Sequence, residues 1–302
     1  MNKSFTLIEI LVVIVVIGVL SAFILVGMNS ISSSANIAKG QAFANSLRNS
    51  LLISLVSEWR FDNITDYDPS TKIINSNIGN IPDSWGINNG TANGGPVLKD
   101  SNNCVSGKCI NFTGSNYIEI NSVQLKNTHN TGEVCYSVWY RGSGTIIHRG
   151  NSGSCQYEPM IAHDYVALSG CGGSGRVVTL NPSSGWNYLV VSFSENSDEA
   201  TIYLNANLII TISLATIKGN SSSPGNIFNS TENIMAIGAT NLTPNFNGYI
   251  DIIGVYSNPL SESEILQNYY SGLNNLLTNN NINKQEFNQR LVELKTNTVE
   301  HE

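Results

Sequence analysis

The stretch NFTGSNYIEI, residues 111–120, alternates apolar and polar side chains on both sides of Gly114 and Ser115. Successive side chains of a β-strand point to opposite faces, so an alternating pattern predicts a strand with one buried face. Glycine and serine favour turns, and here they interrupt the alternation midway. The stretch therefore predicts two short strands, Cys109–Phe112 and Tyr117–Ile120.

The same pattern continues in both directions along the chain. From Ser57 to Tyr256, short alternating runs are separated by clusters of Gly, Asn, Pro and Ser. The other predicted strands are Glu58–Asp62, Cys135–Arg141, Thr145–His148, Val177–Leu180, Asn187–Ser194, Ala200–Leu204, Leu208–Ile212, Ile234–Gly238 and Gly248–Tyr256. About a dozen short strands without helical segments between them predict an all-β jelly-roll sandwich, with a barrel as the alternative.

Several local motifs follow one another in this region. They are residues 59–62 (WRFD), 83–91 (DSWGINNGT), 111–120, 136–140 (YSVWY), 186–193 (WNYLVVSF), 200–205 (ATIYLN), 247–251 (NGYID) and 255–265. In this order they resemble a laminin G-like domain of the concanavalin A-like lectin/glucanase superfamily, from Leu55 to Tyr270. The side chains expected to point between the two sheets are Trp59, Trp139, Ile250 and Val255.

The chain begins MNKSFTLIEILVVIVVIGVL, a short polar leader followed by an apolar run. The run from Ile10 to Met28 has no charge and approaches the ~20 residues that a helix needs to cross a bilayer. A secretory signal peptide is one alternative, but its apolar core is shorter, about 7–15 residues. A plain membrane anchor is another, although it does not account for Glu9.

The leader Met1–Ser4, the junction FTLIE at residues 5–9 and the apolar helix resemble the precursor of a type IV pilin or pseudopilin. The resemblance extends to about Leu55. It implies that a prepilin peptidase cuts between Ser4 and Phe5 and methylates the new N-terminus. The family usually has Gly in place of Ser4, and often a Pro halfway down the helix, which residues 22–27 lack.

Glu9 is an acid near the start of the apolar segment. A carboxylate in hydrocarbon is costly, so it needs a partner. The resemblance implies that the N-terminal amine of a neighbouring subunit neutralises Glu9 and sets the axial register of a helical filament. Prepilin peptidase, other pilin subunits and the inner-membrane assembly machinery are therefore expected partners. Lys3 agrees with a cytoplasmic leader and an external C-terminal domain, carried to the cell surface by the filament.

The apolar residues after Met28 keep a helical spacing. One stripe consists of Phe43, Leu47, Leu51 and Leu55. The chain is thus predicted to contain a leader at 1–4, one long helix at 5–55 with its transmembrane part at about 8–28, the sandwich at 56–272 and a polar linker with a C-terminal helix at 273–302. Asn283 and Glu286 form the expected cap of that last helix.

Five cysteines follow the apolar segment, which fits export to an oxidising compartment. Cys104 and Cys109 enclose a turn-forming tetrapeptide, which predicts one disulfide. Cys155 and Cys171 lie almost symmetrically about a predicted hairpin turn, which predicts a second. Cys135 then remains as a buried free thiol. Zinc is the rival interpretation, but the sequence has no CxxC pair and no cluster of histidines.

The charged residues argue against two functional classes. The formal net charge is −7 without a basic cluster, so nucleic acid is not an expected partner. Catalysis is not expected, because a retaining glycosidase needs two carboxylates about 5–5.5 Å apart. The acidic cluster at 195–199 has the composition of a solvated turn, and Glu262 and Glu264 begin a short helix that Ser261 caps.

Binding through loops at one rim is the function that the laminin G-like resemblance implies. Aromatic faces stack on sugars, and amides bind hydroxyl groups. The candidate residues for a glycan or protein ligand are Trp85, Asn88, Asn89, Tyr157 and Asp164. Asp62 and Asp251 are candidates for a structural Ca²⁺, whose remaining oxygen ligands would come from carbonyls or water.

Together, the two resemblances favour a pilin-like structural subunit of a type IV pilus or related surface filament. Such a subunit would display a lectin-like domain for adhesion, and many weak sites on one filament would bind by avidity. A minor pseudopilin of a secretion or DNA-uptake machine is one alternative. A membrane-tethered glycan-active enzyme is another.

Overall fold

The computed structural model describes Ile14 and residues 54–150, 158–170, 173–174, 178–218 and 233–299. The chain divides into two compact units, Met1–Ser50 and Leu51–Glu302. Of the first unit only Ile14 is described, and it is helical. Ser4, Phe5 and Glu9 therefore lie outside the described residues, as does nearly all of the predicted N-terminal helix. None of the helices that are described combines the length and the apolar character that a membrane crossing requires.

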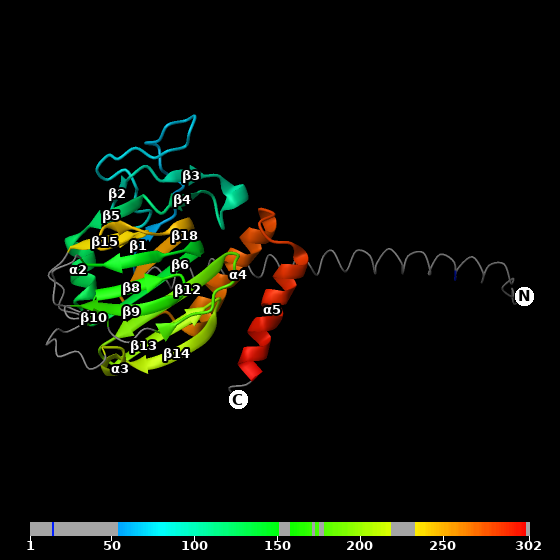
Figure 1. The fold of residues 1–302 in the computed structure, drawn as a ribbon. Helices are drawn as coiled ribbons and strands as arrows, with labels where there is room; N and C mark the ends of the chain where they lie inside the picture. The colour runs from blue at the N-terminus through cyan, green and yellow to red at the C-terminus, as the bar shows by residue number, and fades with distance from the viewer. Residues whose placement is uncertain are drawn as a thin grey trace, which may run out of the picture. The chain divides into compact units, whose positions relative to one another are not determined.

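The first sheet of the second unit contains eight strands (Figure 1). Across the sheet they are β14 (Asn207–Ser213), β13 (Glu199–Leu204), β12 (Asn187–Ser194), β6 (Glu133–Ser143), β18 (Asn247–Tyr256), β4 (Cys109–Thr113) and β3 (Val97–Lys99), with β1 (Leu55–Trp59) paired to β18. All these pairs are antiparallel. β1 begins at Leu55, where the sequence pattern placed the end of the N-terminal helix.

The second sheet also contains eight strands, again antiparallel. They are β10 (Gly173–Ser174), β9 (Tyr165–Gly170), β8 (Glu158–Ala162), β7 (Thr145–Arg149), β15 (Ile234–Ile237), β5 (Tyr117–Asn121) and β2 (Gly90–Asn93), with β11 (Val178–Thr179) beside β9. The remaining short elements are the pair β16 (Ala239–Thr240) and β17 (Thr243–Pro244), the turn η1 (Ser101–Asn103), and the helices α2 (Val123–His129) and α3 (Leu214–Lys218).

The two strands of residues 111–120 belong to different sheets. β4 pairs with β3 and β18, whereas β5 pairs with β2 and β15. The connection between them crosses from one layer to the other, and Gly114 takes a φ of 78° there, which glycine adopts without strain. The strands from β4 to β7 alternate between the layers. The predicted all-β jelly-roll sandwich is therefore confirmed.

The main hydrophobic core lies between the two sheets. Trp59, Ile250 and Val255 point into it as predicted, each no more than 2% exposed. The prediction for Trp139 is wrong, because its ring belongs to a second cluster on the outer face of the first sheet. It stacks there on Tyr188 and Tyr269, with ring centroids 5.1 and 5.6 Å away. β6 is buried on both faces, so a period of two could not tell which face Trp139 occupies.

Helix α4 (Glu262–Thr278) packs on this outer cluster and is longer than the short helix predicted. Leu273 and Leu276 are completely buried and continue its apolar face. The boundary predicted between residues 272 and 273 therefore falls inside α4. The run of Asn and Thr that suggested a linker is instead the last turn of the helix and the short connection after it.

Both C-terminal helices begin with the caps that the sequence predicts. Ser261 and Glu264 form a reciprocal capping box at the start of α4. At the start of α5 (Lys284–Val299), Asn283 Oδ1 accepts the backbone N–H of Glu286 at 2.9 Å. Each cap satisfies N–H groups that have no partner within the helix.

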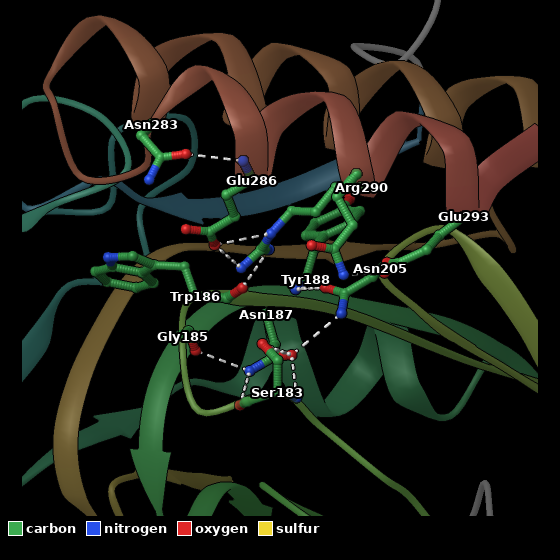
Figure 2. A network of polar contacts seen from close by, with 11 residues as sticks. Ser183, Gly185, Trp186, Asn187, Tyr188, Asn205, Asn283, Glu286, Arg290 and Glu293 are labelled. Atoms are coloured by element: carbon green, nitrogen blue, oxygen red, sulfur yellow. Dashed lines mark hydrogen bonds and ion pairs between the residues drawn. The ribbon is translucent and has the colours of Figure 1, made fainter.

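Helix α5 docks on the outer face of the first sheet (Figure 2). Arg290 donates to the carbonyl oxygen of Trp186 at 2.7 Å and binds Glu286 through two nitrogens, at 2.7 and 3.1 Å. Ile282 and Leu294 are buried in the same cluster. A charged side chain held by three bonds and flanked by apolar contacts fixes the helix to the sheet. The C-terminal segment is thus part of the second unit rather than a loose tail.

Candidate functional site

The loop between β1 and β2 is organised by the carboxylate of Asp83. Its oxygens accept four backbone N–H groups, from Glu58 (3.0 Å), Trp85 (3.0 Å), Gly86 (2.9 Å) and Asn88 (3.0 Å). Aspartate commonly holds turns in this way, by accepting N–H groups a few residues further along the chain. This role of Asp83 was not predicted from the sequence, although an aspartate with a glycine three positions later is a signal for such a turn.

The same loop presents apolar side chains to solvent. Trp85 is 45% exposed while its indole N–H donates to Leu55 O at 2.9 Å, and Ile87 is 82% exposed. Gly86 lies between them, and a Cβ added there would lie 2.5 Å from a backbone oxygen. We call Trp85, Ile87 and Asn89 the Trp85 ledge. An exposed aromatic ring on a fixed backbone is suited to stacking on a sugar ring.

The two asparagines of the loop differ in what they can offer a ligand. Asn88 is only 4% exposed, and its Nδ2 donates to Ser57 Oγ at 2.6 Å and to Gln124 Oε1 at 3.0 Å. It links β1 to α2 and has a structural role. Asn89 is exposed, and its Oδ1 accepts one backbone N–H at 2.9 Å. No hydrogen bond joins its Nδ2 group to the part of the chain that the structure describes, so this group can donate to a ligand.

Asp164 lies apart from the ledge, in the turn between β8 and β9. Its side chain is 48% exposed, and its Oδ1 is 3.1 Å from His163 Nδ1. That nitrogen accepts the backbone N–H of Gly144 at 3.0 Å, so its lone pair is occupied and it cannot donate to the carboxylate at the same time. Among the described residues, no contact joins Asp164 to the ledge. Tyr157 lies outside the part of the chain that the structure describes.

Asp62 and Asp251 both bind the loop closed by Cys104 and Cys109, which we call the disulfide loop. Asp251 is fully buried, and its oxygens accept the N–H groups of Ser106 at 2.9 Å and Ile252 at 2.8 Å. Asp62 accepts the N–H of Lys108 at 2.8 Å. Burial raises the pKa of Asp251 to about 8, against the lowering effect of these two N–H donors. The two acids therefore anchor backbone in this structure.

A Ca²⁺ ion at these two acids stays a prediction. Ca²⁺ takes about 6–8 oxygen ligands. Across the residues that the structure describes, no group of three or more His, Cys, Asp or Glu side chains could hold a metal ion. Backbone carbonyls and water would have to supply most of the ligands.

The predicted disulfide between Cys104 and Cys109 is present, with the Cα atoms 5.4 Å apart. Carbonyl oxygens of the disulfide loop accept the side-chain N–H groups of Asn279 and Asn281, at 3.3 and 2.8 Å. These asparagines lie between α4 and α5. The loop is therefore bonded to the sandwich through two aspartates and to the helical pair through two asparagines.

Of the predictions for the other three cysteines, the one for Cys135 is confirmed and the one for Cys155 and Cys171 is not tested. Cys135 is buried and free as predicted, but it lies in the outer cluster beneath α4 rather than between the sheets. The hairpin predicted around residues 163–164 is present as β8 and β9. Cys155 and Cys171 lie outside the described residues, so their disulfide stays a prediction.

The acidic residues weighed for catalysis have structural roles where they are described. Glu262 Oε1 accepts the hydroxyl of Tyr203 at 3.1 Å, and Glu264 caps α4. Residues 195–198 form the connection between β12 and β13, as predicted.

Two family models match the chain. One, described as the concanavalin A-like lectin/glucanases superfamily, matches residues 112–266, about half of the chain. The other, described as the prokaryotic N-terminal methylation motif, matches residues 1–25. No curated protein sequence matches the chain.

Solved structures similar to this chain include one domain of an arabinanase and two botulinum neurotoxin structures. Domain 4 of an extracellular arabinanase from Geobacillus stearothermophilus, in complex with arabinotriose, is 14% identical with a TM-score of 0.47, over 70% of this chain and 97% of that one. A botulinum neurotoxin serotype D/C binding domain is 13% identical with a TM-score of 0.52, over 74% and 53%. A botulinum neurotoxin type C structure, described as interacting with two ganglioside molecules, is 12% identical with a TM-score of 0.50, over 74% and 53%.

These identities are low, so the likeness to the two toxin structures shows the fold alone. This chain spans about half the length of the toxin chains that it matches.

Proposed function

We propose that this chain, which belongs to the concanavalin A-like lectin/glucanases superfamily, is a pilin-like structural subunit that displays a carbohydrate-binding sandwich on a type IV pilus or related surface filament. The observation that carries the proposal is the union of two modules in one chain. The N-terminal methylation motif at residues 1–25 implies processing by a prepilin peptidase, and the superfamily match at residues 112–266 supplies a lectin-like domain.

The N-terminal module explains how the domain would reach the surface. Cleavage between Ser4 and Phe5 would leave the apolar helix on the mature protein. Glu9 would then pair with the N-terminal amine of the next subunit, because an unpaired carboxylate is costly in the dry core of a filament. Repeated contacts of this head-to-tail kind build an open helical assembly.

The sandwich would bind rather than catalyse. The Trp85 ledge offers an exposed aromatic face and an open amide on a loop that Asp83 fixes. A preorganised aromatic ledge loses little entropy on binding, which suits a glycan or protein ligand at low affinity per site. Multivalent display on a filament would raise the effective affinity.

Replacement of Glu9 tests the assembly role. In a strain that lacks the native copy, Glu9→Leu should insert into the membrane as well as the wild type but be absent from sheared surface filaments. Glu286→Leu is not a suitable control, because Glu286 binds Arg290. The control is Glu199→Gln, at an exposed position of β13. Wild-type amounts of Glu9→Leu in the sheared fraction would contradict the proposal.

A further inference from the structure

Arg141 is a half-buried cation without an acidic partner. It lies at the end of β6, directly across from Tyr249 of β18. None of the ion pairs among the described residues includes it, and its guanidinium donates no hydrogen bond to them. Partly buried charges normally have a partner, because burial removes the water that would otherwise solvate them.

Two aromatic rings hold this guanidinium in place. Its central carbon is 4.4 Å from the centroid of the Tyr249 ring and 5.5 Å from that of the Trp186 ring. The two rings lie 6.3 Å apart and are tilted by 56°. We call Arg141, Trp186 and Tyr249 the arginine platform. Contact with aromatic rings fixes a guanidinium while it leaves the N–H groups at its edge free to bind an anion.

The platform contains a second polar group without a partner. Trp186 is 1% exposed, and its indole N–H is buried without an acceptor. A buried donor without an acceptor is rare in folded proteins. Two neighbouring donors, one charged and one neutral, therefore lack the same kind of partner, namely an oxygen acceptor.

The surroundings fix the backbone of the platform. Arg290 of α5 donates to Trp186 O at 2.7 Å, so the backbone of Trp186 is fixed from the helix side (Figure 2). On the strand side, Gly248 lies so close to β6 that a Cβ there would be 2.2 Å from Arg141 O. The strands and the docked helix therefore hold the backbone in position, and only the arginine side chain has to move when a ligand binds.

We propose that the arginine platform binds the carboxylate of an acidic saccharide such as a uronic acid. One carboxylate oxygen pairs with the guanidinium of Arg141. The other accepts the indole N–H of Trp186 once the arginine side chain shifts on its rings to admit it. A carboxylate fits better than a neutral hydroxyl group, because its hydrogen bond to the guanidinium is charge-assisted and its second oxygen is available to the indole N–H. The choice of a saccharide over an acidic peptide rests on the proposed lectin-like function.

Two sugars that differ at a single carbon provide the test. Galacturonic acid carries a carboxylate where galactose carries a CH₂OH group. Titrated into the full chain in detergent, galacturonic acid should bind at least tenfold more tightly than galactose. The indole N–H proton of Trp186 should shift downfield in NMR spectra with the acid only. Arg141→Gln should make the two affinities equal. Arg60→Gln, which removes a partly exposed arginine directly after β1, should leave the preference for galacturonic acid unchanged.

Three results would overturn the inference. They are equal affinity for the two sugars, an unchanged preference in Arg141→Gln, and binding of a triaspartate peptide in place of the saccharide. If Arg141→Gln fails to fold, the NMR shift of Trp186 in the wild type decides alone. Filament assembly is measured separately, so failure here leaves the proposed assembly role intact, and the reverse also holds.

Discussion

Two loops of this chain are held by aspartate side chains that accept backbone N–H groups, and they differ in what surrounds the carboxylates. Asp83 holds the loop of the Trp85 ledge, where Trp85 is 45% and Ile87 82% exposed. Asp62 and Asp251 hold the disulfide loop, where both cysteines and Asp251 are fully buried. An aspartate that accepts backbone N–H groups therefore has a different role in each loop. In the first loop it fixes side chains for display, and in the second it locks the sandwich to the helical pair.

The largest effect should come from breaking the disulfide loop. Gly107 has a φ of 54°, and a Cβ there would lie 1.9 Å from an Asp62 oxygen. Gly107→Ala should lower the free energy of unfolding by about 3 kcal/mol, because left-handed strain adds to a clash that forces Asp62 off Lys108. Urea unfolding measures this loss.

Gly114→Ala is the matched control for that substitution. Gly114 also has a positive φ, 78°, but nothing lies within 4 Å of the added Cβ. It should cost about 1–2 kcal/mol, the strain of the left-handed conformation alone. Equal losses for the two variants would show that the contact with Asp62 does not restrict the disulfide loop.

The buried side chain of Asp251, which binds the disulfide loop from β18, should make stability depend on pH. The pKa of Asp251 is raised from 3.8 to about 8, so the folded chain keeps a proton that the unfolded chain releases. Its contribution to stability is therefore present at low pH and declines as pH rises from about 4 to about 8. Thermal unfolding at pH 4, 6 and 8 should show a smaller decline in Asp251→Asn than in the wild type.

Asp198→Asn serves as the control for this pH series. Asp198 lies in an exposed turn at a φ of 54°, which asparagine tolerates. The control should keep the wild-type pH dependence. A decline in Asp251→Asn as steep as in the wild type would mean that Asp251 is ionised in the folded chain throughout this range.

Substitution of Trp85 in the ledge should weaken glycan binding and leave stability almost unchanged. On an oligosaccharide array, Trp85→Ala should bind the glycans that the wild-type protein binds at least tenfold more weakly, because the substitution removes the stacking face. The midpoint of thermal unfolding should change by only about 2 °C, since the side chain is half exposed. Val292→Ala, at a 62% exposed position of α5, should change neither. Undiminished binding by Trp85→Ala would exclude the ledge as a glycan site.

The sequence predicted the elements of this fold better than their partners. Alternation located β4 and β5, but nothing local could assign them to different sheets, because that depends on distant strands. The two-residue alternation of side chains correctly placed Trp139 on a strand. It wrongly placed the ring between the sheets, because β6 is covered on both faces. Spacing alone sufficed for the Cys104–Cys109 disulfide, because a short loop leaves few other geometries.

The candidate site was predictable in part. The exposed Trp85 follows from its place in a turn-rich motif, whereas the burial of Asn88 depends on Ser57 and Gln124, which are distant in sequence. Asp62 and Asp251 were predicted together as candidate Ca²⁺ ligands, and β1, which Asp62 follows, pairs with β18, which contains Asp251. That they would bind the disulfide loop could not be predicted from the sequence, because both acids are distant in sequence from the residues of the loop.

Mass spectrometry of material sheared from the cell surface tests whether this chain is a processed filament subunit. We expect the chain to be present in that fraction and to begin at Phe5 with a methylated N-terminus, so that Glu9 and the whole apolar helix remain on the mature protein. An N-terminus at or after residue 22, or absence of the chain from the filament fraction, would contradict this expectation.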